Sequence, residues 1–309
     1  MPEDWLAVTL RFALYLDLMV LFGVSLFSLY ALGPTDPSSG ISRLYGRMTN
    51  ASALAGIVLS IWDVVAMAES MSGATRYSEL TSHVFDTILT GTAVGAAWLV
   101  RLAVLAAGVV AAIAWRRNAR RRQIGLAASG AIALTTLAWA GHGAMDDGLR
   151  GVLHLAVDVT HLLAAGMWVG ALVAFVVLSS ARRTGTPHTV QTLSRAASGF
   201  ATIGTCIVAM LIATGVVNYV LVAGPTFDAL FTTPYGRLLL GKLVLFALML
   251  ALAAGNRYRL SPRLAAAIRA GDSTGAVKAL HRSLQAETCL AVLILALVAW
   301  LGLLSPVAA

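Results

Sequence analysis

Residues 151–180 read GVLHLAVDVT HLLAAGMWVG ALVAFVVLSS, and among them only His154, Asp158 and His161 are ionisable. A helix needs about 20 predominantly apolar residues to cross the hydrocarbon core of a membrane. Because lipid offers no partner to exposed backbone N–H and C=O groups, such a span must be helical. The stretch therefore predicts a transmembrane helix.

Seven further segments of similar length and apolar character occur along the chain. With residues 151–180 they predict eight spans, at about 5–32, 46–72, 84–114, 122–141, 150–180, 196–223, 236–256 and 284–304. Of the 309 residues, 59% are hydrophobic and 12% are charged, about half the charge of a typical soluble domain. We expect an all-α polytopic membrane helix bundle that forms a single domain over residues 1–309, with the lipid bilayer as its surroundings.

The basic residues predict the orientation of this bundle. Sixteen Lys and Arg residues lie in or beside the first, third, fifth and seventh connections, against four on the opposite side. Because cytoplasmic loops accumulate Lys and Arg, we expect both termini in the periplasm of a Gram-negative cell. The net charge of +8 is then explained without a nucleic-acid partner. We expect the basic segment 257–283 to form one or two short helices on the cytoplasmic membrane surface.

The fifth span carries the clearest functional signal. His154, Asp158 and His161 are spaced i, i+4 and i+7, which places them on one helix face. Ionisable groups inside a membrane are costly and are usually functional, and imidazole is the commonest metal ligand. His142 and Met145 lie in the loop just before this span. The pattern predicts a metal or cofactor site in the outer half of the bundle, and the alternative is a polar contact between helices.

Three other sets of residues are weaker candidates. Asp63, Met67 and Met71 share a face of the second span and could form a path toward the site, although methionine often fills gaps in apolar helices. His83 lies in another outer loop. Arg101 in the third span is expected to form a structural ion pair with one of the carboxylates of Asp17, Asp63 or Glu287.

Together these residues resemble the copper-resistance membrane protein CopD (PcoD-like) family. The resemblance covers most of the chain and is carried by Thr90, Gly95, Trp98 and Arg101, by Gly141-His142, His154, His161 and Trp168-Val-Gly170, by Thr233-Pro-Tyr-Gly236, Lys242 and Asn256-Arg257, and by Arg282, Leu284 and Glu287. It implies a multi-pass protein of the bacterial inner membrane with a role in copper homeostasis. By position, it implies the copper ligands His142, His154 and His161, with Asp158 added from its spacing alone or as an acceptor that orients an imidazole.

The resemblance also implies transport of copper, as Cu(I) or Cu(II), from the periplasm toward the cytoplasm. A separate periplasmic copper carrier of the CopC type would deliver it. On this hypothesis the protein is a transporter or binding protein and not an enzyme, and Asp63, Asp158 or Glu287 could relay protons.

Two other functions stay open from the sequence. The first is a b-type haem protein for membrane electron transfer, possibly a copper reductase, with axial ligands drawn from His83, His142, His154 and His161. The second is a sensor or scaffold in which the polar stripe of the fifth span is purely structural.

Overall fold

The computed structural model describes residues 5–32, 40–73, 79–141, 147–180, 186–224 and 228–304. Eight of the helices in these ranges are long and apolar enough to cross a membrane, which confirms the predicted all-α membrane bundle. The helices are α1 (Trp5–Ala31), α2 (Gly40–Ser72), α3 (Ser82–Gly91), α4 (Ala93–Ala114), α5 (Ala119–Thr135), α6 (Gly148–Ser179), α7 (Pro187–Ala223), α8 (Asp228–Thr232), α9 (Pro234–Gly255), α10 (Ser261–Ala270) and α11 (Thr274–Leu301).

The third predicted span is divided, and here the expectation of one helix over 84–114 was wrong. Thr92 separates α3 from α4, with an extended backbone at φ −128° and ψ 147°. Its hydroxyl accepts a hydrogen bond from the backbone N–H of Gly95 at 3.0 Å, which caps the start of α4. A hydropathy pattern does not register such a cap, so α4 alone forms the span.

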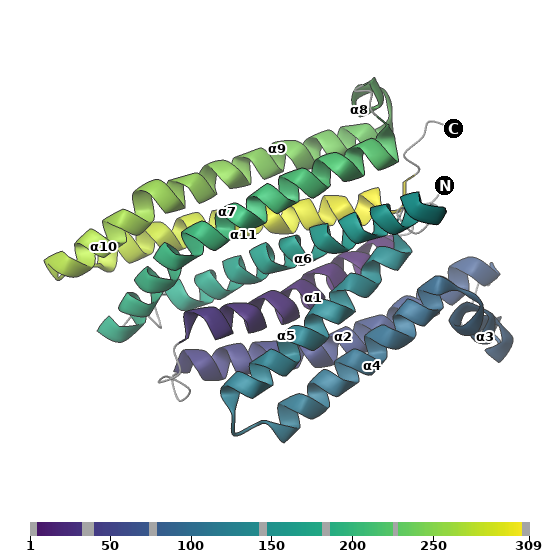
Figure 1. Ribbon diagram of the computed structural model, residues 1–309, viewed down its shortest axis with the longest axis horizontal. Coiled ribbons are helices and arrows are strands. Elements are labelled where there is room, and N and C mark those ends of the chain that lie inside the picture. Colours follow the sequence, from purple (N-terminus) through teal and green to yellow (C-terminus); the bar gives the residue numbers. More distant parts are fainter. Residues whose placement is uncertain are drawn as a thin grey trace.

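The basic segment 257–283 extends two neighbouring helices. A π-helical turn over Asn256–Leu260 leads from α9 directly into α10. Gly271 then ends α10 with a φ of 86°, a left-handed conformation that favours glycine. The chain turns back there and begins α11 at Thr274. In Figure 1, α10 continues the line of α9 at the end of the bundle far from the termini.

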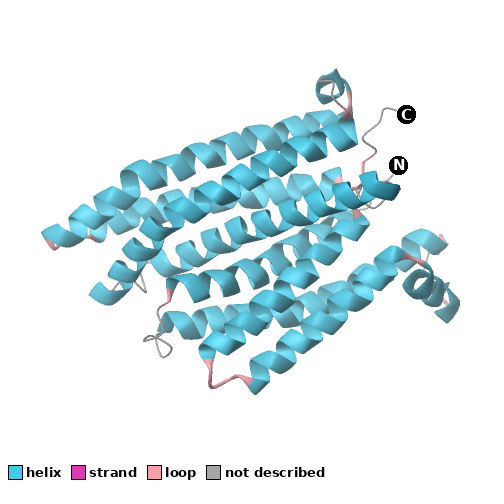
Figure 2. Cartoon of the chain, in the orientation of Figure 1, coloured by secondary structure: helices cyan, strands magenta, loops and turns pink. Residues whose placement is uncertain are grey.

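Helix α1 occupies the centre of the bundle. It packs against α2 and α5 on one side and against α6 and α11 on the other, so that α2–α5 and α6–α11 form two groups around it (Figures 1 and 2). The ring centroids of Trp5 in α1 and Trp300 in α11 are 5.6 Å apart. The first helix therefore begins, and the last one ends, at the same end of the bundle.

The backbones of α1 and α6 meet at glycines. A β-carbon on Gly170 would overlap Gly23, and one on Gly23 would overlap the carbonyl oxygen of Gly166. Small residues let transmembrane helices approach closely and gain van der Waals contact. These three glycines therefore set the distance between the central helix and α6.

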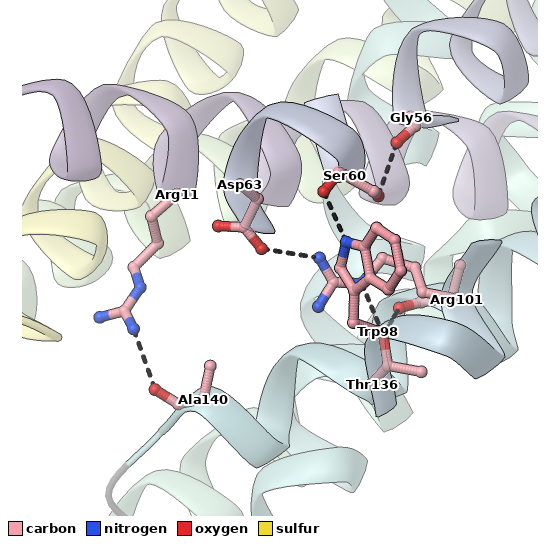
Figure 3. A network of polar contacts seen from close by, with 9 residues as sticks. Arg11, Gly56, Ser60, Asp63, Trp98, Arg101, Thr136 and Ala140 are labelled. Atoms are coloured by element: carbon pink, nitrogen blue, oxygen red, sulfur yellow. Dashed lines mark hydrogen bonds and ion pairs between the residues drawn. The ribbon is translucent and has the colours of Figure 1, made fainter. Parts of the chain in front are cut away.

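A buried ion pair fixes α4 to α2. The Arg101 side chain, 1% exposed, places Nη1 3.1 Å from Oδ2 of Asp63, and its Nε donates to the Thr136 hydroxyl at 2.9 Å (Figure 3). Nearby, the Trp98 indole N–H donates to the Ser60 carbonyl at 2.6 Å. From the sequence, Asp17, Asp63 and Glu287 were all possible partners of Arg101, and the structure shows that Asp63 is the partner.

Replacing Gly170 by alanine should destabilise the protein. The added methyl group has no room against Gly23, and overpacking of this kind costs about 1–3 kcal/mol in the free energy of unfolding. Thermal unfolding in detergent micelles would measure the effect. Gly255→Ala is the matched control, because a β-carbon there meets nothing within 4 Å. Equal melting temperatures for the two variants would contradict the close crossing.

Replacing Asp63 by asparagine should also lower stability, because it leaves the Arg101 charge buried without its counter-ion. We expect a loss of about 3 kcal/mol, the low end of the range for breaking a buried pair, since the Asp63 side chain is 29% exposed. Asp86→Asn on exposed α3 is the control for the same chemical change. An unfolding midpoint for Asp63→Asn that matches this control would show that the pair does not hold α4 in place.

Candidate functional site

A cavity of about 190 Å³ with several charged and polar side chains in its lining lies between α1, α6, α7, α9 and α11. It is near the end of the bundle where α1 begins and α11 ends. We call it the outer cavity, because the sequence predicts that this end faces the periplasm. Its charged and polar lining residues are Arg11, Tyr15, His154, Asp158, His161, Asn218, Tyr219, Tyr235 and Lys242. The three ionisable residues of α6 that the sequence placed on one face thus line one cavity.

His154 and Asp158 lie next to each other in the outer cavity. The imidazole of His154 is 2% exposed, and its Nε2 is 3.9 Å from Oδ2 of Asp158. The other carboxylate oxygen, Oδ1, accepts a hydrogen bond from the Asn218 amide of α7 at 2.7 Å. Asp158 is therefore held between the two helices with its second oxygen toward the imidazole.

The hydrogen bonds around His161 select one tautomer of its ring. Nδ1 of His161 is 2.8 Å from the Thr214 hydroxyl oxygen, and that hydroxyl donates to the Met210 carbonyl at 2.6 Å. A hydroxyl has one proton to donate, so the N–H of this pair belongs to Nδ1 of His161. The lone pair then lies on Nε2, which is the form of imidazole that binds a metal ion.

Two basic side chains share the outer cavity with Asp158. The Arg11 guanidinium donates to the Ala140 carbonyl at 2.9 Å (Figure 3). Lys242 enters from α9, and no carboxylate of the described residues lies within 4.0 Å of its ammonium group. The site is therefore a mixed one, with one carboxylate, two imidazoles and two basic side chains.

Several predicted residues lie away from this cavity. Met67, Met71 and Asp63 are on α2 and His83 is on exposed α3, which packs on α2 and α4 on the other side of α1. None of them lines the outer cavity. Asp17 of α1 lies against Gly56 of α2, where a β-carbon would be 3.0 Å from its Oδ2.

The predicted ligand His142 and the neighbouring Met145 lie outside the described residues. Within the ranges that are described, no group of three or more His, Cys, Asp or Glu side chains is close enough to hold one metal ion. His154, Asp158 and His161 therefore share a cavity without forming a closed ligand set of their own.

Two partners of the α6 residues, both on α7, were not predicted from the sequence. Thr214 and Asn218 are four residues apart, hence on one face of the helix, and they hold His161 and Asp158. Two polar residues one turn apart in the second half of a mostly apolar span were the available signal. Lys242 was visible as an intramembrane charge, but nothing in the sequence placed it opposite α6.

Two more cavities follow the outer one along the same helices. An apolar middle cavity of about 560 Å³ shares His161 and Lys242 with the outer cavity. An inner cavity of about 290 Å³, toward α10, shares Trp168 with the middle one and contains Glu287. The three cavities thus form a row between α6, α7, α9 and α11, and buried Trp168 separates the inner cavity from the rest.

Comparison with known proteins identifies the family. The family model described as copper resistance protein D-like, N-terminal domain, matches residues 1–152, and the one described as copper resistance protein D matches residues 194–301. The chain is 43% identical over 304 residues to copper resistance protein D of Pseudomonas syringae pv. tomato, covering 98% of each chain. It is 26% identical over 261 residues to inner membrane protein YebZ of Escherichia coli K12, covering 84% of this chain and 85% of that protein.

No solved structure matches the chain significantly. The resemblance seen in the sequence is confirmed by the family models and by the relative of nearly equal length. With its eight apolar helices, the chain is a multi-pass inner-membrane protein that belongs to the copper resistance protein D family.

Proposed function

We propose that this protein binds copper in the outer cavity, at His154, Asp158 and His161, and moves it across the inner membrane along the row of three cavities. The direction we propose is from the periplasm, where a carrier of the CopC type would deliver copper, to the cytoplasm. The protein would act as a transporter, without a catalysed reaction. The observation that carries this proposal is the histidine-lined outer cavity and its continuation toward α10.

The ligand chemistry of the outer cavity supports copper. Imidazole nitrogen suits copper in either common oxidation state, and the bond from His161 to Thr214 leaves Nε2 of His161 as the metal-binding nitrogen. A hydrogen bond to the far nitrogen of a ligating imidazole is the usual way in which proteins orient it. His142, the third predicted ligand, directly follows Gly141, which lines the outer cavity.

The placement of the histidines favours copper over haem. Of the described histidines, only His154 and His161 line the outer cavity, and both project from α6. Axial ligands of one haem approach its iron from opposite faces, which two residues on the same side of one helix do not provide. His83, a candidate for a second pair, is on α3 beyond α2 and α4.

The double variant His154→Ala/His161→Ala should purify without the copper that the wild-type protein binds. Elemental analysis of the folded protein after loading with copper and removal of the excess measures the stoichiometry. His83→Ala is the control and should keep the wild-type copper content. Unchanged copper in the double variant would refute the site, and a Soret band in the visible spectrum of the wild-type protein would favour the haem alternative.

Thr214→Val should weaken copper binding by about 10–100-fold, the usual effect of losing a partner that orients a metal-binding histidine. Valine keeps the shape of threonine but cannot hydrogen bond to Nδ1 of His161. Thr214→Ser restores a hydroxyl and should bind nearly as tightly as wild type. Competition titrations with a copper chelator give the affinities, and equal affinities for the valine and serine variants would show that Thr214 does not orient His161.

A further inference from the structure

The inner cavity has a single carboxylate among its described lining residues, Glu287 of α11. The Glu287 side chain is 2% exposed. It faces a space of about 290 Å³ that Trp168 separates from the middle cavity and that reaches the π-helical turn at the end of α9. Glu287 therefore lies beyond the copper site on the same row of cavities.

The hydrogen-bond partner of Glu287 is neutral. Its Oε2 accepts from the Asn256 amide at 2.8 Å, and no basic group of the described chain lies within 4.0 Å of its carboxylate. An ionised carboxylate buried without a counter-ion is strongly disfavoured. The charge of Glu287 must therefore be balanced by a proton or by a cation in the cavity.

The charged residue that lines this cavity together with Glu287 is Arg257, whose side chain is exposed and bonded to α7. Arg257 donates to the Ala201 carbonyl at 3.0 Å and to the Thr205 hydroxyl of α7, and its guanidinium lies 5.2 Å from the centre of the Tyr258 ring. From α6, α7, α9 and α10 no described Asp, Glu, His, Lys or Arg lines the space. His281 of α11 contacts Ser179 of α6, outside the lining.

Asn256 is suited to both protonation states of Glu287. Its NH₂ group donates to the carboxylate, and after a half-turn of the amide its Oδ1 could accept the O–H of the carboxylic acid. Asn256 is 8% exposed, and its Oδ1 is buried without a hydrogen-bond partner among the described residues. The pair can therefore exchange a proton without a second charged residue.

We infer that Glu287 is a proton-exchange site, which releases its proton when the transported cation enters the inner cavity and takes up a proton when the cation leaves. In the first step the O–H bond of the Glu287 carboxyl breaks, the proton passes to solvent, and the cation balances the carboxylate. In the second step the carboxylate binds a proton from solvent. The described lining residues offer oxygen ligands and include no Cys, Met or His side chain. Cu(I) prefers such softer ligands, so Glu287 balances charge and does not retain copper.

The protonation of Glu287 is testable without transport, although its exchange with copper rests on the proposed function. Infrared difference spectra of the full-length protein should contain the C=O stretch of a protonated carboxyl group that shifts in D₂O and disappears at high pH. Glu287→Gln should lack this band, and Glu69→Gln on α2, away from all three cavities, should keep it. Identical bands in wild type and Glu287→Gln would overturn the inference.

A second variant separates protonation from loss of fold. Asn256→Leu removes the hydrogen-bond partner but keeps the carboxyl group, so its C=O band should persist and move to higher frequency. If Glu287 had only a structural role, its C=O band would not shift in this variant. An unshifted band in Asn256→Leu would therefore contradict the assignment of the Glu287–Asn256 pair as the exchange site.

Copper addition tests the exchange itself. With excess Cu(I), the Glu287 band should fall in wild type and in Glu69→Gln, while elemental analysis of the same samples gives the copper bound. If copper binds and the band is unchanged, the exchange is wrong and the proposed copper site stands. If no copper binds, the proposed function fails together with the exchange, and the pH-dependent band still decides whether Glu287 holds a proton.

Discussion

The close contact between α1 and α6 is the constraint on which the rest of the arrangement depends. Lipid provides no hydrophobic force to drive helices together, so close packing of small residues must do so, and Gly23, Gly166 and Gly170 allow it here. Gly166 follows His161 by five residues, which is about 140° around the helix. Turning the glycine face toward α1 therefore directs the face of His154, Asp158 and His161 into the space bordered by α7 and α9.

The intramembrane charges divide according to their partners. Arg101 and Asp63 neutralise each other between α2 and α4, away from the row of cavities. The Asp63 carboxylate therefore already has its counter-ion and does not require a cation from the cavities. His161, Asp158 and Glu287 lie on the row, and each is hydrogen-bonded to a neutral residue of another element: Thr214, Asn218 and Asn256, respectively. A hydroxyl or amide orients an ionisable group without cancelling its charge or its lone pair, which is what a group that binds and releases cations requires.

Sequence periodicity and hydropathy predicted the parts of this arrangement that depend on one helix at a time. The number of spans and the shared face of His154, Asp158 and His161 are of this kind. The choice of Asp63 as partner of Arg101, and the separation of Met67 and His83 from the outer cavity, depend on the order of helices around α1. The helix cap at Thr92 and the hydrogen bond from Asn218 were not predicted, because one capping hydroxyl or one bridging amide changes the mean hydropathy of a span very little.

The candidate site lies on α6, which packs against the central helix α1 on one side and against α7 and α11 of its own group on the other. The two family models match residues 1–152 and 194–301, so that His154, Asp158, His161 and Trp168 fall in the stretch between them. A site on α6 can draw side chains from the central helix as well as from its own group, as the outer cavity does with Arg11 and Tyr15 of α1 and Lys242 of α9. Because α7 and α9 line the cavities while Gly166 and Gly170 contact α1, the helix contact and the cavities occupy different faces of α6.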